Sequence, residues 1–177
     1  MTNKIYLFLV AAIIAAVAGF FFHKNSLEGE QKVTDMLYEL NFADSKGGQV
    51  NLQQYKGEWL VVNFWATWCA PCREEIPELN QFHLTNQIKL IGIAIDDIDA
   101  VNKFQKKIPI KYPSYIIDDL SGVKLSQSMG NEKGVLPFTV LINPNNDIEK
   151  LYYGKVNIYK ILNKTIKCRQ KTVFSSK

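Results

Sequence analysis

The sequence predicts a mixed α/β fold in which helices cover both faces of a central sheet. The chain has 177 residues, and two runs that are apolar apart from one residue each, Trp59–Ala66 and Ile88–Ile95, are typical of fully buried strands. Each run is followed by a segment with helical character, and a strand, a turn, a strand and an amphipathic helix close the chain. Strands that alternate with helices in this way form a sheet with helices on its two sides.

A β-hairpin is predicted before the first buried strand. Met36–Phe42 is expected to form a short strand and Gln49–Leu52 its partner. Asp44–Gly48 lies between them and has the composition of a turn. Tyr55–Gly57 ends this N-terminal extension.

Two helices are predicted next to the buried strands. The first begins after Cys69 and runs to about Asn86, with a kink at Pro77, because proline cannot donate a helical hydrogen bond. The second covers Asp99–Lys107, where apolar residues recur at helical spacing. Pro109 follows and ends it.

The second half of the chain is predicted to complete the sheet. Tyr112–Ile117 is expected to be extended and Leu120–Met129 to form a short helix. Phe138–Ile142 and Ile148–Tyr153 read as two strands joined by a turn rich in Asn and Pro. Val156–Lys171 has apolar residues along one side and is predicted as the closing helix.

Residues 1–24 are predicted to anchor the chain in a membrane. Ile5–Phe22 is a run of 18 residues without charge, close to the ~20 needed to span a bilayer. A cleaved signal peptide is an alternative, because residues 16–18 offer an A-x-A site that would be cut after Ala18. The aromatic residues 20–22 favour the anchor, since the flank of a cleavage site is usually more polar. A buried core helix fits less well, because the run is apolar all round.

The rest of the chain divides into a polar tether at residues 25–35, one domain at 36–171 and a tail at 172–177. Hydrophobic residues make up 47% of the sequence, which supports a packed core. The net charge is +4 and there is no basic cluster, so the sequence gives no indication of nucleic-acid binding.

The chain contains three cysteines, Cys69, Cys72 and Cys168, which are too few for a disulfide-stapled scaffold. Cys69 and Cys72 lie where a buried strand leads into a helix start. The unpaired N–H groups and partial positive charge there favour a thiolate, the reactive form of cysteine. A zinc site would need four ligands. The other candidate ligands are Cys168, His83 and His23, and none of them forms a second closely spaced pair like Cys69 and Cys72. No metal site is therefore predicted. Cys168 is expected to be a buried, inert thiol, with an intermolecular disulfide as the alternative.

Three separated motifs occur in an order that resembles a known family. They are the sequence NFWATWCAPCREE at residues 63–75, Tyr55–Gly57 upstream of it and Gly134–Thr139 downstream. Together they resemble the TlpA-like branch of the thioredoxin superfamily, over roughly Met36 to Ile166. The resemblance implies a thioredoxin-like fold and a membrane-anchored, extracytoplasmic thiol–disulfide oxidoreductase.

The resemblance also implies roles for the residues of the site. Cys69 would attack a target disulfide, and Cys72 would then resolve the mixed disulfide. Trp68, Leu136 and Pro137 would contact the substrate, with the Leu136–Pro137 peptide in the cis form and Leu136 offering its backbone for strand-like pairing. The alternative for Pro137 is a trans proline that merely opens a strand.

Glu75 lies three residues after Cys72 and shares its helical face. In TlpA-like proteins a glutamate here influences the thiols and proton transfer; the alternative is an ordinary acidic residue in the first turn of a helix. Asn63 stands where thioredoxins carry a buried aspartate, and asparagine cannot titrate. This departure makes Glu75 the expected proton carrier. The charges of Glu74 and Glu75 oppose a thiolate at Cys69, which favours a reductase over a strong oxidant.

The expected partners follow from the same resemblance. They are disulfide-bearing proteins, such as apocytochrome c or a metal-delivery protein, and an electron donor in the membrane; no cofactor is expected. The domain would lie on the extracytoplasmic side of the inner membrane. Alternatives are a dedicated cytochrome c maturation thiol reductase and a copper-binding metallochaperone with Cys69 and Cys72 as ligands. A peroxidase of the peroxiredoxin kind would need a threonine at position 66, where the chain has Ala66.

Overall fold

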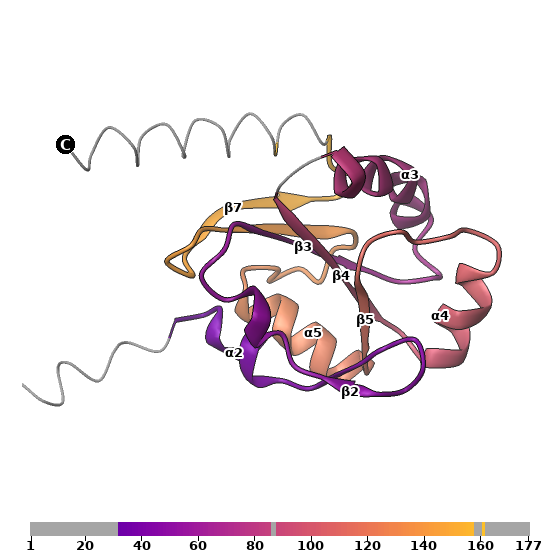
Figure 1. Ribbon diagram of the computed structural model, residues 1–177, viewed down its shortest axis with the longest axis horizontal. Helices are drawn as coiled ribbons and strands as arrows, with labels where there is room; N and C mark the ends of the chain where they lie inside the picture. Colours follow the sequence, from indigo (N-terminus) through magenta and orange to yellow (C-terminus); the bar gives the residue numbers. More distant parts are fainter. Residues whose placement is uncertain (1–31, 86–87, 158–160, 162–177) are drawn as a thin grey trace, which may run out of the picture. The chain divides into compact units, whose positions relative to one another are not determined.

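A computed structural model of the chain describes residues 32–85, 88–157 and 161 (Figure 1). The predicted anchor, residues 25–31 of the tether, the tail and Cys168 lie outside these residues, as does most of the predicted helix Val156–Lys171. Among the described residues there is no helix with the length and apolar character that a membrane span requires.

A seven-stranded mixed sheet forms the centre of the domain, in the order β2-β1-β5-β4-β3-β6-β7. The three central strands β3, β4 and β5 are parallel to one another, and every other neighbouring pair is antiparallel. The strands are β1 (Phe42–Ala43), β2 (Gln49–Val50), β3 (Leu60–Trp65), β4 (Lys89–Ile95), β5 (Ser114–Ile117), β6 (Phe138–Ile142) and β7 (Ile148–Tyr153). The helices are α2 (Asp35–Glu39), α3 (Ala70–Thr85), α4 (Ile98–Gln105) and α5 (Asp119–Ser128), with a short 3₁₀ turn at Gln53–Tyr55.

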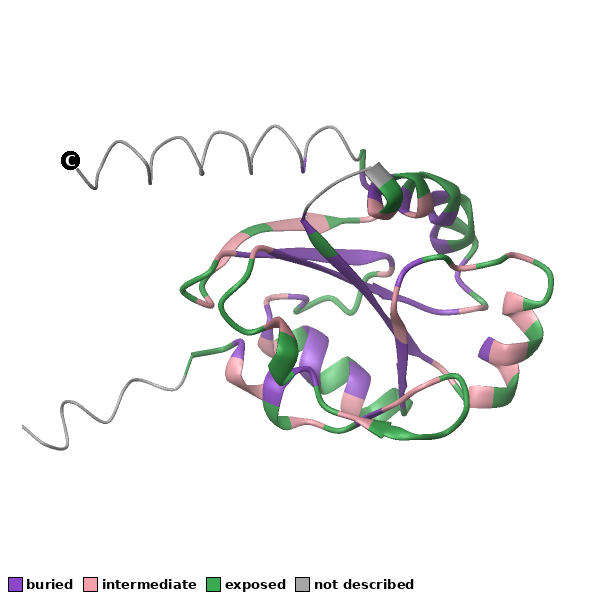
Figure 2. Cartoon of the chain, in the orientation of Figure 1, coloured by how far each residue is buried: buried purple, intermediate pink, exposed green. Residues whose placement is uncertain are grey.

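Alternate residues of β3 serve the two faces of the sheet, which is itself largely buried (Figure 2). Val62 and Phe64 belong to a core cluster that includes residues of α2 and α5. Val61 packs on the opposite face with residues of α3, and Trp65 packs near the start of that helix. Asn63 shares this second face, so the middle of β3 presents one polar side chain to α3. The predicted α/β fold with helices on both faces is therefore confirmed.

The first predicted strand, Met36–Phe42, is wrong over most of its length. Residues 35–39 form the helix α2, and only Phe42 and Ala43 pair in the sheet, antiparallel to β2. Leu37 and Tyr38 are both buried in the same core cluster. A strand would turn these neighbours to opposite faces, whereas a helical turn keeps both on the core. The hairpin extension itself is present in a shortened form.

The other predicted elements appear close to their expected positions. α3 begins right after Cys69 and contains Pro77, and α4 ends before Pro109. Aspartates cap two of the helices. Asp97 accepts the N–H of Ala100 at 2.8 Å, and Asp118 accepts the N–H of Ser121 at 3.0 Å. Asp118 directly follows β5 and Asp97 lies two residues after the end of β4, so both caps stand at the carboxyl ends of parallel strands.

Gly122 marks the closest approach of α5 to the sheet. A Cβ atom at this position would lie 2.8 Å from Cγ1 of Ile95 and 2.9 Å from Cγ2 of Ile117. Both contacts are with β-branched side chains of buried strands, which have little freedom to move. The absence of a side chain at Gly122 therefore sets the distance between this helix and the sheet.

Gly122→Ala is expected to destabilise the domain. Alanine favours a helix by about 1 kcal/mol over glycine, but overpacking a tight core costs about 1–3 kcal/mol. We expect the packing cost to prevail, giving a lower free energy of unfolding in urea. Lys124→Ala, at an exposed position of the same helix, is the control and should change stability little. A more stable Gly122→Ala protein would show that the helix can shift away from the sheet.

Candidate active site

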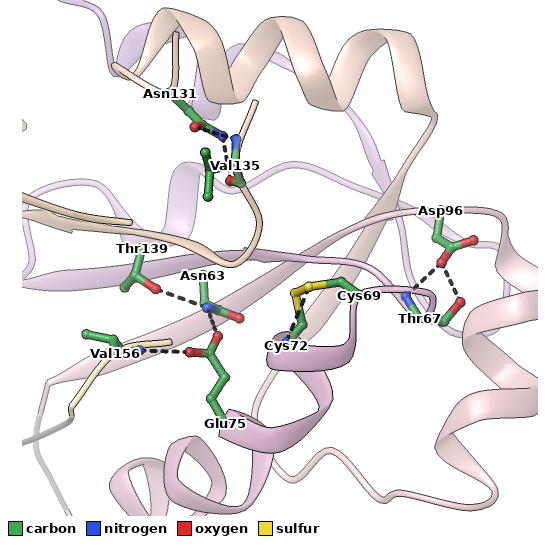
Figure 3. The surroundings of a disulfide bond; sticks show 10 residues. All are labelled: Asn63, Thr67, Cys69, Cys72, Glu75, Asp96, Asn131, Val135, Thr139 and Val156. Atoms are coloured by element: carbon green, nitrogen blue, oxygen red, sulfur yellow. Dashed lines mark hydrogen bonds between the residues drawn. A yellow bond between two sulfur atoms is a disulfide. The ribbon is translucent and has the colours of Figure 1, made fainter. Parts of the chain in front are cut away.

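Cys69 and Cys72 stand at the start of α3 and are joined by a disulfide bond (Figure 3). Cys69 immediately precedes the helix, and its carbonyl oxygen accepts the N–H of Arg73 at 3.2 Å. Its Sγ accepts the N–H of Cys72 at 3.3 Å. Cys69 retains 5% exposure, whereas Cys72 is fully buried. Cys69 is thus the more accessible of the two residues, and the start of the helix directs an N–H group toward its sulfur.

The turn that carries Cys69 is fastened to the neighbouring strand. Both the N–H and the Oγ1 of Thr67 donate to Oδ2 of Asp96, at 2.9 and 2.7 Å. Asp96 directly follows β4, which lies parallel to β3. Because parallel strands end at the same edge of a sheet, the two residues meet there. The predicted strand Ile88–Ile95 ends just before Asp96, but the sequence did not indicate this bond.

Trp68 is 67% exposed beside the buried disulfide. It lines an open groove of about 710 Å³ together with Ile98 and Leu120, and Leu120 is itself largely exposed. A large aromatic ring that faces solvent next to a reactive pair is available for contact with another protein.

The Leu136–Pro137 peptide bond is cis, as the resemblance predicts. Leu136 is half-buried and packs against the core cluster that contains both cysteines of the disulfide. Asn131, which is fully buried, fixes the preceding loop. Its side chain donates to the carbonyl oxygen of Val135 and accepts the N–H of the same residue, both at 3.0 Å. These two hydrogen bonds could not be predicted from the sequence, because an isolated asparagine before a glycine-containing loop resembles any turn residue.

Glu75 is buried behind the disulfide, one helical turn after Cys72. Its Oε1 accepts the side-chain Nδ2 of Asn63 at 2.7 Å, and its Oε2 accepts the N–H of Val156 at 3.1 Å. Asn63 also donates to Oγ1 of Thr139, at 3.0 Å, its register partner on β6. Asn63 and Thr139 have less than 2% exposure, as does Glu75. Two separate segments thus donate to one buried carboxyl group, and a third, β6, holds the asparagine that is one of the donors (Figure 3).

Burial raises the pKa of Glu75 from 4.5 to about 7. The hydrogen bonds from Val156 and Asn63 oppose this change, because they favour the charged carboxylate. The charge of Glu78 raises the pKa further and that of Lys155 lowers it. A carboxyl group with a pKa near neutrality can both take up and release a proton at physiological pH.

Residues 31–155 match the model of a family described as AhpC/TSA. The chain belongs to the AhpC/TSA family. Two relatives of this family member are the thiol–disulfide oxidoreductases ResA of Bacillus subtilis (strain 168) and of Bacillus cereus (strain ATCC 10987). The first is 26% identical over 163 residues, covering 87% of this chain and 88% of the relative. The second is 29% identical over 111 residues, covering 59% of this chain and 64% of the relative, less than two thirds of its length.

Solved structures show the same fold for this AhpC/TSA family member. A thioredoxin-related protein from Neisseria meningitidis serogroup B superposes with a TM-score of 0.65 and 29% identity, over 73% of this chain and 98% of the other. StoA from Bacillus subtilis superposes with a TM-score of 0.56 and 22% identity, over 71% of this chain and 95% of StoA. The predicted TlpA-like resemblance and thioredoxin-like fold are confirmed. With its paired cysteines and its ResA relatives, the protein is a thiol–disulfide oxidoreductase.

The free energy of unfolding of the oxidised protein is expected to fall as the pH rises from about 4.5 to about 7, the two pKa values of Glu75. In this window the folded state binds more protons than the unfolded state, and the loss is on the order of 3 kcal/mol. Glu75→Gln should remove most of this slope, as measured by urea unfolding at pH 5 and pH 8. Glu74→Gln is the control, because Glu74 is exposed. A full slope in the Glu75→Gln protein would contradict the assignment.

Proposed function

We propose that the protein is a membrane-tethered, extracytoplasmic reductase of protein disulfides. The observation that carries this proposal is the arrangement of one accessible and one buried cysteine at a helix start, with a buried carboxyl group one turn behind them. Residues 1–24 would anchor the chain, 25–35 would tether it, and 36–171 would form the catalytic domain before a tail at 172–177. The uncharged run Ile5–Phe22 supports the anchor.

The reaction begins with the reduced protein. The thiolate of Cys69 attacks one sulfur of the target disulfide, and the other target sulfur leaves as a thiolate and takes up a proton. Cys72 then loses its proton and attacks Cys69, which releases the second target thiol and forms the Cys69–Cys72 disulfide. Two electrons pass from the protein to the target. Glu75 accepts the proton of Cys72, since its pKa of about 7 suits both uptake and release.

Trp68, Leu136 and Pro137 would hold the target during these steps. Trp68 offers an exposed aromatic surface, and Leu136, which precedes the cis proline, packs against the cluster that contains the two cysteines. An extended target segment would pair with that backbone as an added strand. Such pairing recognises the main chain, so one site could serve several target sequences.

The charges near Cys69 support the reducing direction. Glu74, and Glu75 in its charged form, oppose a thiolate there, so the reduced form is less stabilised than in strong oxidants. Lys155 lies 3.6 Å from Glu74 and offsets part of its charge, but this pair is largely exposed and is worth little. The substrates would be oxidised proteins outside the cytoplasm, such as apocytochrome c or a metal-delivery protein. An electron donor in the membrane would restore the dithiol.

Cys72→Ser is expected to trap the targets. The variant can still form the mixed disulfide through Cys69 but cannot resolve it, so covalent complexes should accumulate on the extracytoplasmic side and disappear with dithiothreitol. Cys69→Ser is the matched control and should trap nothing. If Cys72→Ser captures no protein and Cys69→Ser behaves identically, the exchange mechanism is wrong.

The reduction potential of the Cys69–Cys72 pair is expected to lie well below that of a strong oxidant such as DsbA, at about −120 mV. Equilibration with glutathione buffers, followed by quantification of the free thiols, measures it. A potential above roughly −150 mV would exclude the reducing role.

A further inference from the structure

Two buried polar atoms near Glu75 have no hydrogen-bond partner among the described residues. They are Oδ1 of Asn63 and the hydroxyl oxygen of Tyr112. Asn63 is 1% exposed and Tyr112 is 4% exposed, so bulk water does not reach either group. A buried polar group without a partner costs about 1–3 kcal/mol. Such atoms are therefore normally satisfied, often by an internal water molecule.

The orientation of Asn63 follows from its neighbour. A carboxylate only accepts hydrogen bonds, so Asn63 presents its Nδ2 to Oε1 of Glu75, at 2.7 Å. Nδ2 also donates to Thr139, which fixes the plane of the amide. The amide oxygen must then point away from Glu75, and Figure 3 shows it directed to the side on which the disulfide lies.

Tyr112, in the segment before β5, lies beside Asn63. Its ring covers Gly92, where a Cβ would lie 2.9 Å from Cε2 of the tyrosine. Gly92 is the register partner of Asn63 on the next strand, so the tyrosine ring occupies the space beside the asparagine. The ring also packs among apolar residues of α3, the helix that carries Glu75. The charge of Glu75 contributes to raising the pKa of Tyr112, after burial.

We propose that Tyr112 and Asn63 hold one buried water molecule beside the Glu75 carboxyl group, and that Tyr112 is a positioning residue for proton transfer during disulfide exchange. The water accepts the Tyr112 O–H and donates one hydrogen to Asn63 Oδ1 and the other to Glu75. These three partners are the number that buried water usually has. The inference rests on the proposed role of Glu75 as the proton carrier.

This arrangement gives Glu75 a donor that favours its charged form. Removal of the tyrosine hydroxyl loosens the water and leaves the carboxylate less stabilised, so the pKa of Glu75 rises further. The other groups around this carboxyl are the Val156 N–H and Lys155 after β7, Glu78 on its own helix and Thr139 behind Asn63. None of them changes when Tyr112 becomes phenylalanine.

Tyr112→Phe in the full chain, purified in detergent, tests the inference. The rate at which the reduced protein reduces a model disulfide, oxidised glutathione, is measured against pH. We expect the inflection due to Glu75 to move up by about 0.5 pH unit or more. Tyr38→Phe is the matched control, because the Tyr38 hydroxyl is also buried without a partner among the described residues but lies in the core cluster shared by α2 and α5. It should leave the inflection in place.

The double variant Tyr112→Phe/Glu75→Gln separates positioning from a general structural effect. Its pH profile should equal that of Glu75→Gln alone. Infrared spectra at pH 5 give a second readout, since the carboxyl stretch that Glu75→Gln removes should move to higher frequency in Tyr112→Phe. An unchanged inflection and an unchanged stretch would overturn the inference while leaving the proposed function intact. A wild-type chain that reduces no disulfide would instead overturn the proposed function.

Discussion

The hydrogen bond between Asn63 and Glu75 ties the active-site helix to the centre of the sheet. It joins the middle of β3 to the second turn of α3, and both ends are buried. A carboxyl group at this depth is tolerated only because donors surround it. The same bond fixes the rotation of α3 relative to the strand, and the position of Cys72, one turn earlier, follows from that rotation.

The two faces of the sheet differ in the groups that they bury. The face shared by α2 and α5 is a continuous apolar cluster, in which Gly122 sets the spacing between helix and strands. The opposite face carries the cysteines, the buried carboxyl group and a polar residue at the centre of β3. The first face thus contributes mainly to packing, whereas the second combines apolar packing with the polar groups of the site.

The strands Trp59–Ala66 and Ile88–Ile95 and the helix after Cys69 could be predicted because each is a local pattern. Their apolar runs and the Cys-x-x-Cys spacing need no knowledge of distant residues. The predicted strand Met36–Phe42 was wrong because the burial of this segment depends on a core cluster that includes residues of α5. A short-range pattern does not reveal such a cluster. The cis form of the Leu136–Pro137 bond came only from the family resemblance.

The contacts of the site were harder to predict, because they join residues far apart in the sequence. Thr67 with Asp96 and Asn131 with Val135 are ordinary polar residues until the fold brings them together. The spacing to Cys72 placed Glu75 on the same helical face and the family resemblance implied its role, but neither indicated how deeply it is buried. Burial, rather than residue type, is what shifts its protonation to the neutral range.

One of the two donors to Glu75 is a backbone group, the N–H of Val156. The N–H of Val156 is available with any residue except proline, so this hydrogen bond does not depend on the identity of the side chain, although the Val156 side chain itself is buried in the core. The segment after β7 must nevertheless keep its path. A chain cut before this point, or an insertion between Tyr153 and Val156, would retune the active site although no catalytic side chain had been altered.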